Sequence, residues 1–84
     1  MKKKKITENI ILLLKKIRPI DRKNLDNINN FDFIESGHLD SFEILKFNMF
    51  LEKKFKIKLL PKDVTSKSYK TVIGLTNIID KKLI

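Results

Sequence analysis

The sequence predicts a small all-α domain, and three observations support that fold class. Three stretches carry apolar residues at spacings of three and four, the period of an amphipathic helix. The segments between them are rich in Asn, Asp and Pro, which favour turns. The one alternating segment, 55–59, has no second strand to pair with, so we interpret it as an extended connector. With 84 residues, the chain fits a single domain with a modest core.

The first helix is expected over about 7–17, with Thr7 as its N-cap. One apolar stripe runs along it: Ile6, Ile10, Leu13, Leu14 and Ile17. Pro19 prevents continuation, because the residue before a proline is pushed out of the helical region. We expect residues 1–5, which include four lysines, to form a solvated, frayed basic tail, and residues 6–84 to form the single domain.

Residues 18–40 form a long connection, with a helical turn expected at 25–29. A connection with several apolar side chains should pack on the core, and this one holds Leu25, Ile28, Phe31, Phe33 and Ile34. Loops of this length are unusual in a compact domain and are more often functional than not.

A second long helix is expected over 41–54. Its core stripe consists of Ile44, Phe47, Leu51 and Phe55. Phe42, Leu45 and Met49 lie on an adjoining flank. Asp40 and Glu43 form an Asp-x-x-Glu start signal that is close to a capping box, which predicts Asp40 as the N-cap.

Beyond the connector, Pro61 predicts a short helix over 61–64, because proline suits the first turn of a helix. Residues 66–68 are expected to form a turn. The last helix should cover about 71–82, capped by Thr71 or Ser68. Its buried stripe is Val72, Leu75, Ile78, Ile79 and Leu83, a pattern that Gly74 weakens without overruling it.

The formal net charge of +9 raises nucleic-acid binding as a function. The charges are unevenly placed. Residues 1–23 carry nine basic and two acidic groups, and residues 45–84 carry ten basic and three acidic groups. Residues 24–44, by contrast, carry five acidic groups and no Lys or Arg. An acidic island, residues 24–44, therefore surrounds Ser41. Only Arg18 and Arg22 are arginines, whereas reading of base edges favours the arginine fork. A small basic helical domain that binds nucleic acid is kept as the alternative function, and it is not favoured.

Composition also bears on the cellular compartment. No apolar run approaches the roughly 20 residues that span a bilayer. Cysteine is absent, which excludes disulfides and thiolate metal sites. Glu8 and Asn9 interrupt the N-terminal apolar run, and no small-residue cleavage site follows it, so a signal peptide is not expected. We expect a cytoplasmic monomer without a membrane span.

The sequence offers few groups for catalysis. His38 is the only histidine, and a Ser-His-Asp set built on Ser41 would be nearly contiguous, without an elbow or an oxyanion hole. A metal site from His38, Asp40 and Glu35 would have one nitrogen ligand and mobile carboxylates. His38 is expected to be a solvated loop residue, and the protein is not expected to be an enzyme.

One feature remains, a serine at the first turn of a helix. A phosphate ester on Ser41 would lie near free N–H groups and the positive end of the helix dipole. The alternative is that Ser41 is one of many serines at helix starts. The residues alone leave that choice open.

The stretch FIESGHLDSFEIL at 33–45 resembles the attachment motif of the acyl carrier protein family, Gly-x-x-Asp-Ser followed by an apolar residue. Residues 55–61, FKIKLLP, are similar to the Phe-Gly-Ile-x-Ile-Pro segment of that family, with an extra apolar residue before Pro61. Residues 63–72 resemble its third-helix region and the Thr-Val that starts its fourth helix. The resemblance extends in order over most of the chain.

The resemblance implies a small four-helix bundle of acyl-carrier type with a long loop between helices one and two. It implies 4′-phosphopantetheine on Ser41, added from coenzyme A by a phosphopantetheinyl transferase, with Asp40 assisting beside it. Acyl or aminoacyl groups would travel on that arm as thioesters, loaded by a ligase and handed to acyltransferase-type enzymes. The expected partner-binding residues are Glu35, Phe42, Glu43, Leu45, Lys46 and Met49, although Phe42, Leu45 and Met49 are also interpretable as core.

The chain departs from this family in charge. Family members are usually acidic, and their second helix presents carboxylates to basic enzymes. Here that helix carries Lys46, Lys53 and Lys54 against Glu43 and Glu52. We therefore expect a specialised carrier of fatty-acid or secondary-metabolite biosynthesis with dedicated partners. A third alternative is a protein-interaction adaptor of the same fold that is not modified.

Overall fold

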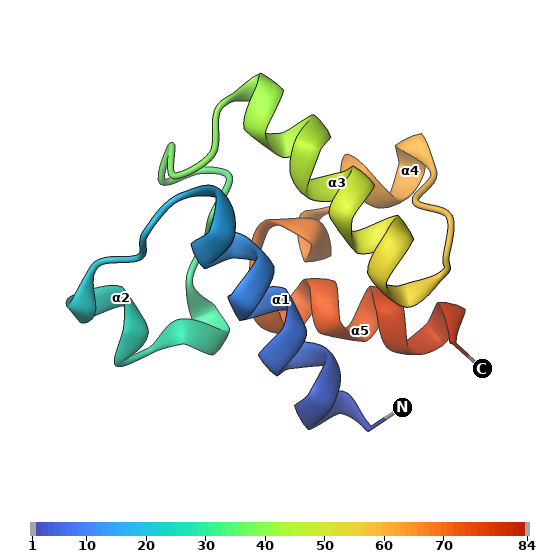
Figure 1. Ribbon diagram of the computed structural model, residues 1–84, viewed down its shortest axis with the longest axis horizontal. Coiled ribbons are helices and arrows are strands. Elements are labelled where there is room, and N and C mark those ends of the chain that lie inside the picture. Colours follow the sequence, from blue (N-terminus) through green and yellow to red (C-terminus); the bar gives the residue numbers. More distant parts are fainter. Residues whose placement is uncertain (1, 84) are drawn as a thin grey trace.

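Three long helices surround one core in the computed structural model, which describes residues 2–83 (Figure 1). They are α1 (Lys3–Ile17), α3 (Ser41–Phe55) and α5 (Val72–Lys82). α1 packs against both α3 and α5. Within the described residues the chain forms helices, turns and loops without a β-strand, apart from an isolated antiparallel bridge between Asp32 and Thr71. The all-α prediction is therefore confirmed.

The core is built from the apolar stripes that the sequence predicts. Each long helix contributes buried residues one turn apart: Ile6, Ile10 and Leu14 from α1, Phe47, Leu51 and Phe55 from α3, and Val72, Leu75 and Ile79 from α5. The remaining members of these stripes lie half-buried against that core. Burial of these faces supplies the main driving force for folding, because it removes apolar surface from water.

The first helix begins earlier than predicted, at Lys3 rather than Thr7. Ile6 is fully buried one turn ahead of Ile10, and lysine is a good helix former, so packing draws the lysine run into the helix. Residues 3–5 are thus helical rather than part of a frayed tail, while Met1 lies outside the described residues. Thr7 is not an N-cap; its hydroxyl lies 2.8 Å from that of Thr76 on α5.

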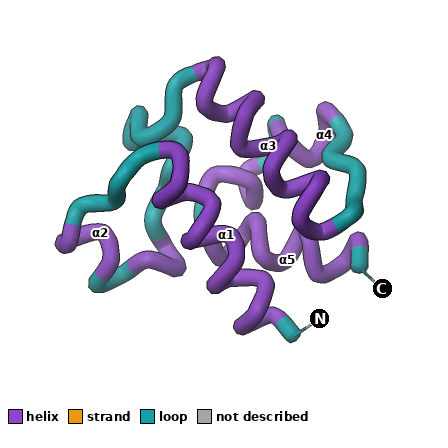
Figure 2. Tube along the Cα trace, in the orientation of Figure 1, coloured by secondary structure: helices purple, strands orange, loops and turns teal. Residues whose placement is uncertain are grey.

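The long connection contains two short helical segments, α2 (Arg22–Leu25) and η1 (Ile28–Asn30), joined by loops (Figure 2). The predicted single turn at 25–29 therefore overlaps the ends of two separate helical segments rather than forming one turn. Ile20, Phe31, Phe33 and Leu39 are buried in the core, so the connection is anchored at its start and over its second half, whereas α2 and η1 have no buried residue. The prediction that Leu25 packs inward is wrong, because its side chain is exposed.

The chain returns to α5 through α4 (Pro61–Val64) and η2 (Lys67–Lys70). The short helix at 61–64 agrees with the prediction, but the turn expected at 66–68 is largely a 3₁₀ helix that buries Tyr69. Tyr69 and Phe47 each meet Phe33 edge to face, with centroids 5.7 and 5.5 Å from that of Phe33. η2 lies so close to α5 that a Cβ on Gly74 would sit 1.9 Å from the Ser68 carbonyl oxygen. Gly74 is therefore needed for this packing.

The end of the domain predicted at residue 84 falls on Ile84, which lies outside the described residues. None of the helices within residues 2–83 is both long and apolar enough to cross a bilayer.

Candidate functional site

Ser41 is the first residue of α3 and is exposed to solvent. It follows Asp40, the N-cap, whose extended backbone (φ −83°, ψ 179°) turns the chain into the helix. The Asp40 carboxylate accepts a hydrogen bond from the Glu43 N–H at 2.8 Å. The N–H groups of Ser41 and Phe42 have no intrahelical acceptor, because the residues four positions earlier are not helical. A group on the Ser41 hydroxyl would thus lie beside two helix-start donors.

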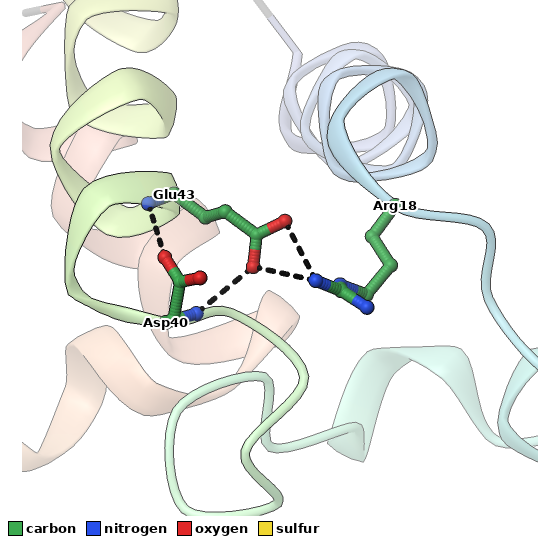
Figure 3. Close-up of polar contacts among 3 residues, drawn as sticks. All are labelled: Arg18, Asp40 and Glu43. Carbon is green, nitrogen blue, oxygen red and sulfur yellow. Dashed lines mark hydrogen bonds and ion pairs between the residues drawn. The ribbon is translucent and has the colours of Figure 1, made fainter.

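Glu43 completes the capping box and extends it to another helix. Its Oε1 accepts a hydrogen bond from the Asp40 N–H at 3.0 Å. Nη2 of Arg18, at the C-cap of α1, donates to Oε1 and Oε2 at 3.1 and 3.0 Å (Figure 3). One carboxylate therefore joins the start of α3 to the end of α1. The predicted Asp40 capping box is confirmed, and Arg18 is an addition to it.

The loop before Ser41 is fixed by backbone contacts to the segment before α5. The Phe33 N–H donates a hydrogen bond to the Lys70 carbonyl at 2.9 Å. Within the loop, the Leu39 N–H donates to the Phe33 carbonyl at 3.3 Å. Gly37 has a φ of 76°, a left-handed conformation that glycine adopts without steric cost. The side chains of Phe33 and Leu39 are buried on either side of this turn. Ser41 is thus presented from an anchored loop.

The acidic island is largely engaged within the protein. The Asp32 carboxylate accepts from the N–H groups of Ile34 and Glu35 at 3.0 and 2.7 Å. Glu35 forms an ion pair with Lys70, and this contact raises the pKa of the Lys70 amine. Together with Glu43, these residues place much of the negative charge near Ser41 in contact with internal donors. Glu35 and Glu43, both predicted to bind partners, are held in this way.

The flank of α3 beyond Ser41 faces solvent. The exposed fractions are 84% for Phe42, 62% for Leu45 and 68% for Met49, so these side chains are not core. Lys46, between them, is also exposed. The structure therefore brings four of the predicted partner-binding residues onto the exposed side of the helix that begins at Ser41.

His38 is half-buried rather than solvated. Its ring meets Phe31 edge to face with centroids 5.1 Å apart. Its Nε2 is buried and has no hydrogen-bond partner among the described residues, so it is not bonded to the Ser41 hydroxyl. Residues 2–83 contain no group of three or more His, Cys, Asp or Glu placed to hold a metal ion. A hollow of about 630 Å³ opens beside the loop and includes His38 and Arg18, but Ser41 does not line it.

Two contacts of this region were not predicted from the sequence. Arg18 is 25 positions from Glu43, and Lys70 is 35 from Glu35, so no local pattern joins them. The only available signal for Arg18 was its place just after the first helix, where a cation suits the negative helix end. Comparison of the chain with protein-family models, curated proteins and solved structures gave no match.

Proposed function

We propose that this chain is a carrier protein that bears 4′-phosphopantetheine on Ser41 and delivers acyl or aminoacyl thioesters to biosynthetic enzymes. The observation that carries the proposal is the presentation of Ser41. Its hydroxyl is exposed at the first position of a 15-residue helix, which Asp40 caps and which follows an anchored loop. The motif Gly37-x-x-Asp40-Ser41, with its resemblance to the acyl carrier protein family, supplies the identity of the attached group.

The surroundings of Ser41 fit a phosphodiester. The N–H groups of Ser41 and Phe42 and the positive end of the α3 dipole favour an anion at this position. In the modification, the Ser41 oxygen attacks the phosphorus of coenzyme A that bears pantetheine, the pyrophosphate bond breaks, and 3′,5′-ADP leaves. The serine proton passes to a base of the transferase. Asp40 contributes by fixing the helix start, and its second carboxylate oxygen remains for the transferase or its metal.

In this proposal the long helices α1, α3 and α5, with the short segment α4–η2, correspond to the four-helix carrier bundle. The thiol of the arm carries the cargo, and the phosphodiester anchors it, so the chain itself needs no catalytic group. We place the protein in the cytoplasm as a monomeric, specialised carrier. Its partners are a phosphopantetheinyl transferase, a loading ligase and acyltransferase-type enzymes.

Transfer of the arm tests the proposal. The apo-protein is incubated with coenzyme A and a broad-specificity phosphopantetheinyl transferase, and its intact mass is then measured. We expect a gain equal to one phosphopantetheine arm, which Ser41→Ala abolishes. Ser68→Ala removes another exposed hydroxyl and should leave the gain intact. A wild-type chain that gains no mass with several active transferases contradicts the proposal.

A nucleic-acid-binding domain is the second candidate, and the net charge of +9 and the exposed lysines at 2–5 are the observations that raise it. Such binding rests on release of counterions, so it falls steeply as salt rises. Unmeasurable binding to unrelated duplex DNA at low salt removes this candidate.

A further inference from the structure

The exposed side of α3 carries three large apolar side chains at helical spacing. Phe42, Leu45 and Met49 are separated by three and four positions, so they lie along one side of the helix directly after Ser41. Single exposed apolar residues are normal on protein surfaces, but a contiguous exposed set marks an interaction site. We call these three residues, with Lys46, Lys53 and Lys54, the α3 face.

The free charge on α3 is positive. Both acidic residues of the helix are used internally: Glu43 binds Arg18 and the Asp40 N–H, and Glu52 accepts the Leu59 N–H at 2.7 Å. By contrast, Lys46, Lys53 and Lys54 are exposed and form no ion pair within the part of the chain that the structure describes. A partner that approaches α3 therefore meets three exposed lysines that no carboxylate of residues 2–83 holds in an ion pair.

The positive charge continues towards α1. A groove of about 400 Å³ between α1 and α3 has Leu13 and Phe50 among its lining residues, together with Lys16, Lys53 and Lys54. The Lys16 amine lies 5.0 Å from the centre of the Phe50 ring, a cation–π contact that leaves its charge uncompensated. Apolar surface and cations thus occur together along this side of the domain.

We propose that the α3 face docks partner enzymes whose own docking surface is an apolar recess rimmed by carboxylates. This inference rests on the proposed function, because the partner must reach the arm on Ser41. Charge complementarity selects an acidic partner, since a basic surface would place like charges against three free lysines. Phe42, Leu45 and Met49 supply the buried anchors, and the lysines raise the rate of encounter.

A transferase with reversed charge tests this inference. One probe is a broad-specificity phosphopantetheinyl transferase with a basic docking surface; the other is the same enzyme with those basic residues changed to Glu. We expect the reversed enzyme to modify Ser41 with a KM lower by on the order of tenfold at low salt, and the difference to shrink at high salt. The variant Lys46→Glu/Lys53→Glu/Lys54→Glu should prefer the unaltered enzyme.

A matched variant separates the α3 face from net charge. Lys58→Glu/Lys62→Glu/Lys67→Glu makes the same charge change at exposed positions outside α3 and should keep the wild-type preference. Equal KM values for the two transferases, or equal effects of the two triple variants, overturn the inference while leaving the carrier function intact. If neither enzyme modifies this chain while each modifies a carrier of matching charge, the proposed function fails and the inference fails with it.

Other occupants of the α3 face give different results. Co-sedimentation with phosphatidylserine vesicles that is lost in the α3 triple variant, without any preference between transferases, assigns the face to an anionic membrane surface instead. A dimer in sedimentation equilibrium that Met49→Lys dissociates assigns it to a second copy of the chain. Either result overturns the inference.

Discussion

The contact between Arg18 and Glu43 makes a prediction about how the helix that presents Ser41 is held. Glu43 serves two functions, since it accepts the Asp40 N–H in the capping box and pairs with Arg18. Glu43→Gln keeps an acceptor for the Asp40 N–H but loses the charge. Glu43→Ala loses both. Comparison of the two variants therefore separates the cap from the ion pair.

The expected magnitudes follow from exposure. The Arg18 side chain is 53% exposed and that of Glu43 19%, so water screens the ion pair. A pair of this kind contributes about 0.5 kcal/mol to the free energy of unfolding. The capping hydrogen bond adds about 1 kcal/mol. We expect Glu43→Gln to destabilise the protein by about 0.5 kcal/mol and Glu43→Ala by about 1.5 kcal/mol.

Urea unfolding of wild type, Arg18→Gln, Glu43→Gln and the double variant gives the coupling energy. We expect about 0.5 kcal/mol at low salt and a value near zero at about 1 M salt, where charges are screened over about 3 Å. Glu43→Ala should lower the midpoint most. A coupling energy of zero at low salt, or equal losses for Glu43→Gln and Glu43→Ala, contradicts the two functions assigned to Glu43.

Three further predictions concern the rest of the fold. Gly74→Ala should destabilise the protein by about 1–3 kcal/mol, although alanine has the better helix propensity, because the new methyl group meets the Ser68 backbone. Thermal unfolding measures this loss, and an unchanged or higher Tm contradicts the close packing of η2 on α5. Lys56 has a φ of 55°, so Lys56→Gly should stabilise the protein by up to about 1 kcal/mol in the same assay, whereas a loss shows that the lysine side chain matters more than the strain. The hydrogen bond from Lys82 lowers the pKa of Asp63 below its ordinary value of 3.8. The ionised Asp63 carboxylate therefore stabilises the folded state above pH 3.8, and this stabilisation is lost as the pH falls through the lowered pKa. Asp63→Asn should therefore cost about 1 kcal/mol at neutral pH, a difference from wild type that disappears in acid; a difference that persists at low pH would show that the charge is not the cause.

Local patterns in the sequence predicted the parts of the fold that depend on periodicity and capping. The stripes on the three long helices, the capping box at Asp40 and the short helix at Pro61 all follow from residues within one or two turns. Each of these features is decided by neighbours in the sequence, so reading the chain in order is sufficient.

Features set by tertiary packing were not predicted. Helix α1 starts at Lys3, because burial of Ile6 against the core outweighs the weak N-cap signal at Thr7. Glycine at position 74 indicated only reduced helix propensity, whereas the structure gives it a packing role against Ser68. Such contacts join residues far apart or depend on distances between elements, neither of which a single sequence specifies.

The candidate site divides in the same way. The position of Ser41, the cap at Asp40 and the flank containing Phe42 were predicted from adjacent residues. The sequence also indicated an acidic island around Ser41, but much of that charge is engaged by Arg18, Lys70 and backbone N–H groups. The charge that remains free on α3 is basic, and only the three-dimensional arrangement distinguishes engaged carboxylates from free ones.

The intact mass of the protein purified from the cell that naturally makes it tests the central proposal most directly. A carrier should have the mass of the chain plus one phosphopantetheine arm, with or without an acyl group, and fragmentation should place the added mass on Ser41. The same measurement identifies the cargo. The bare mass of the chain under all growth conditions would contradict the carrier function and favour an unmodified adaptor of the same fold.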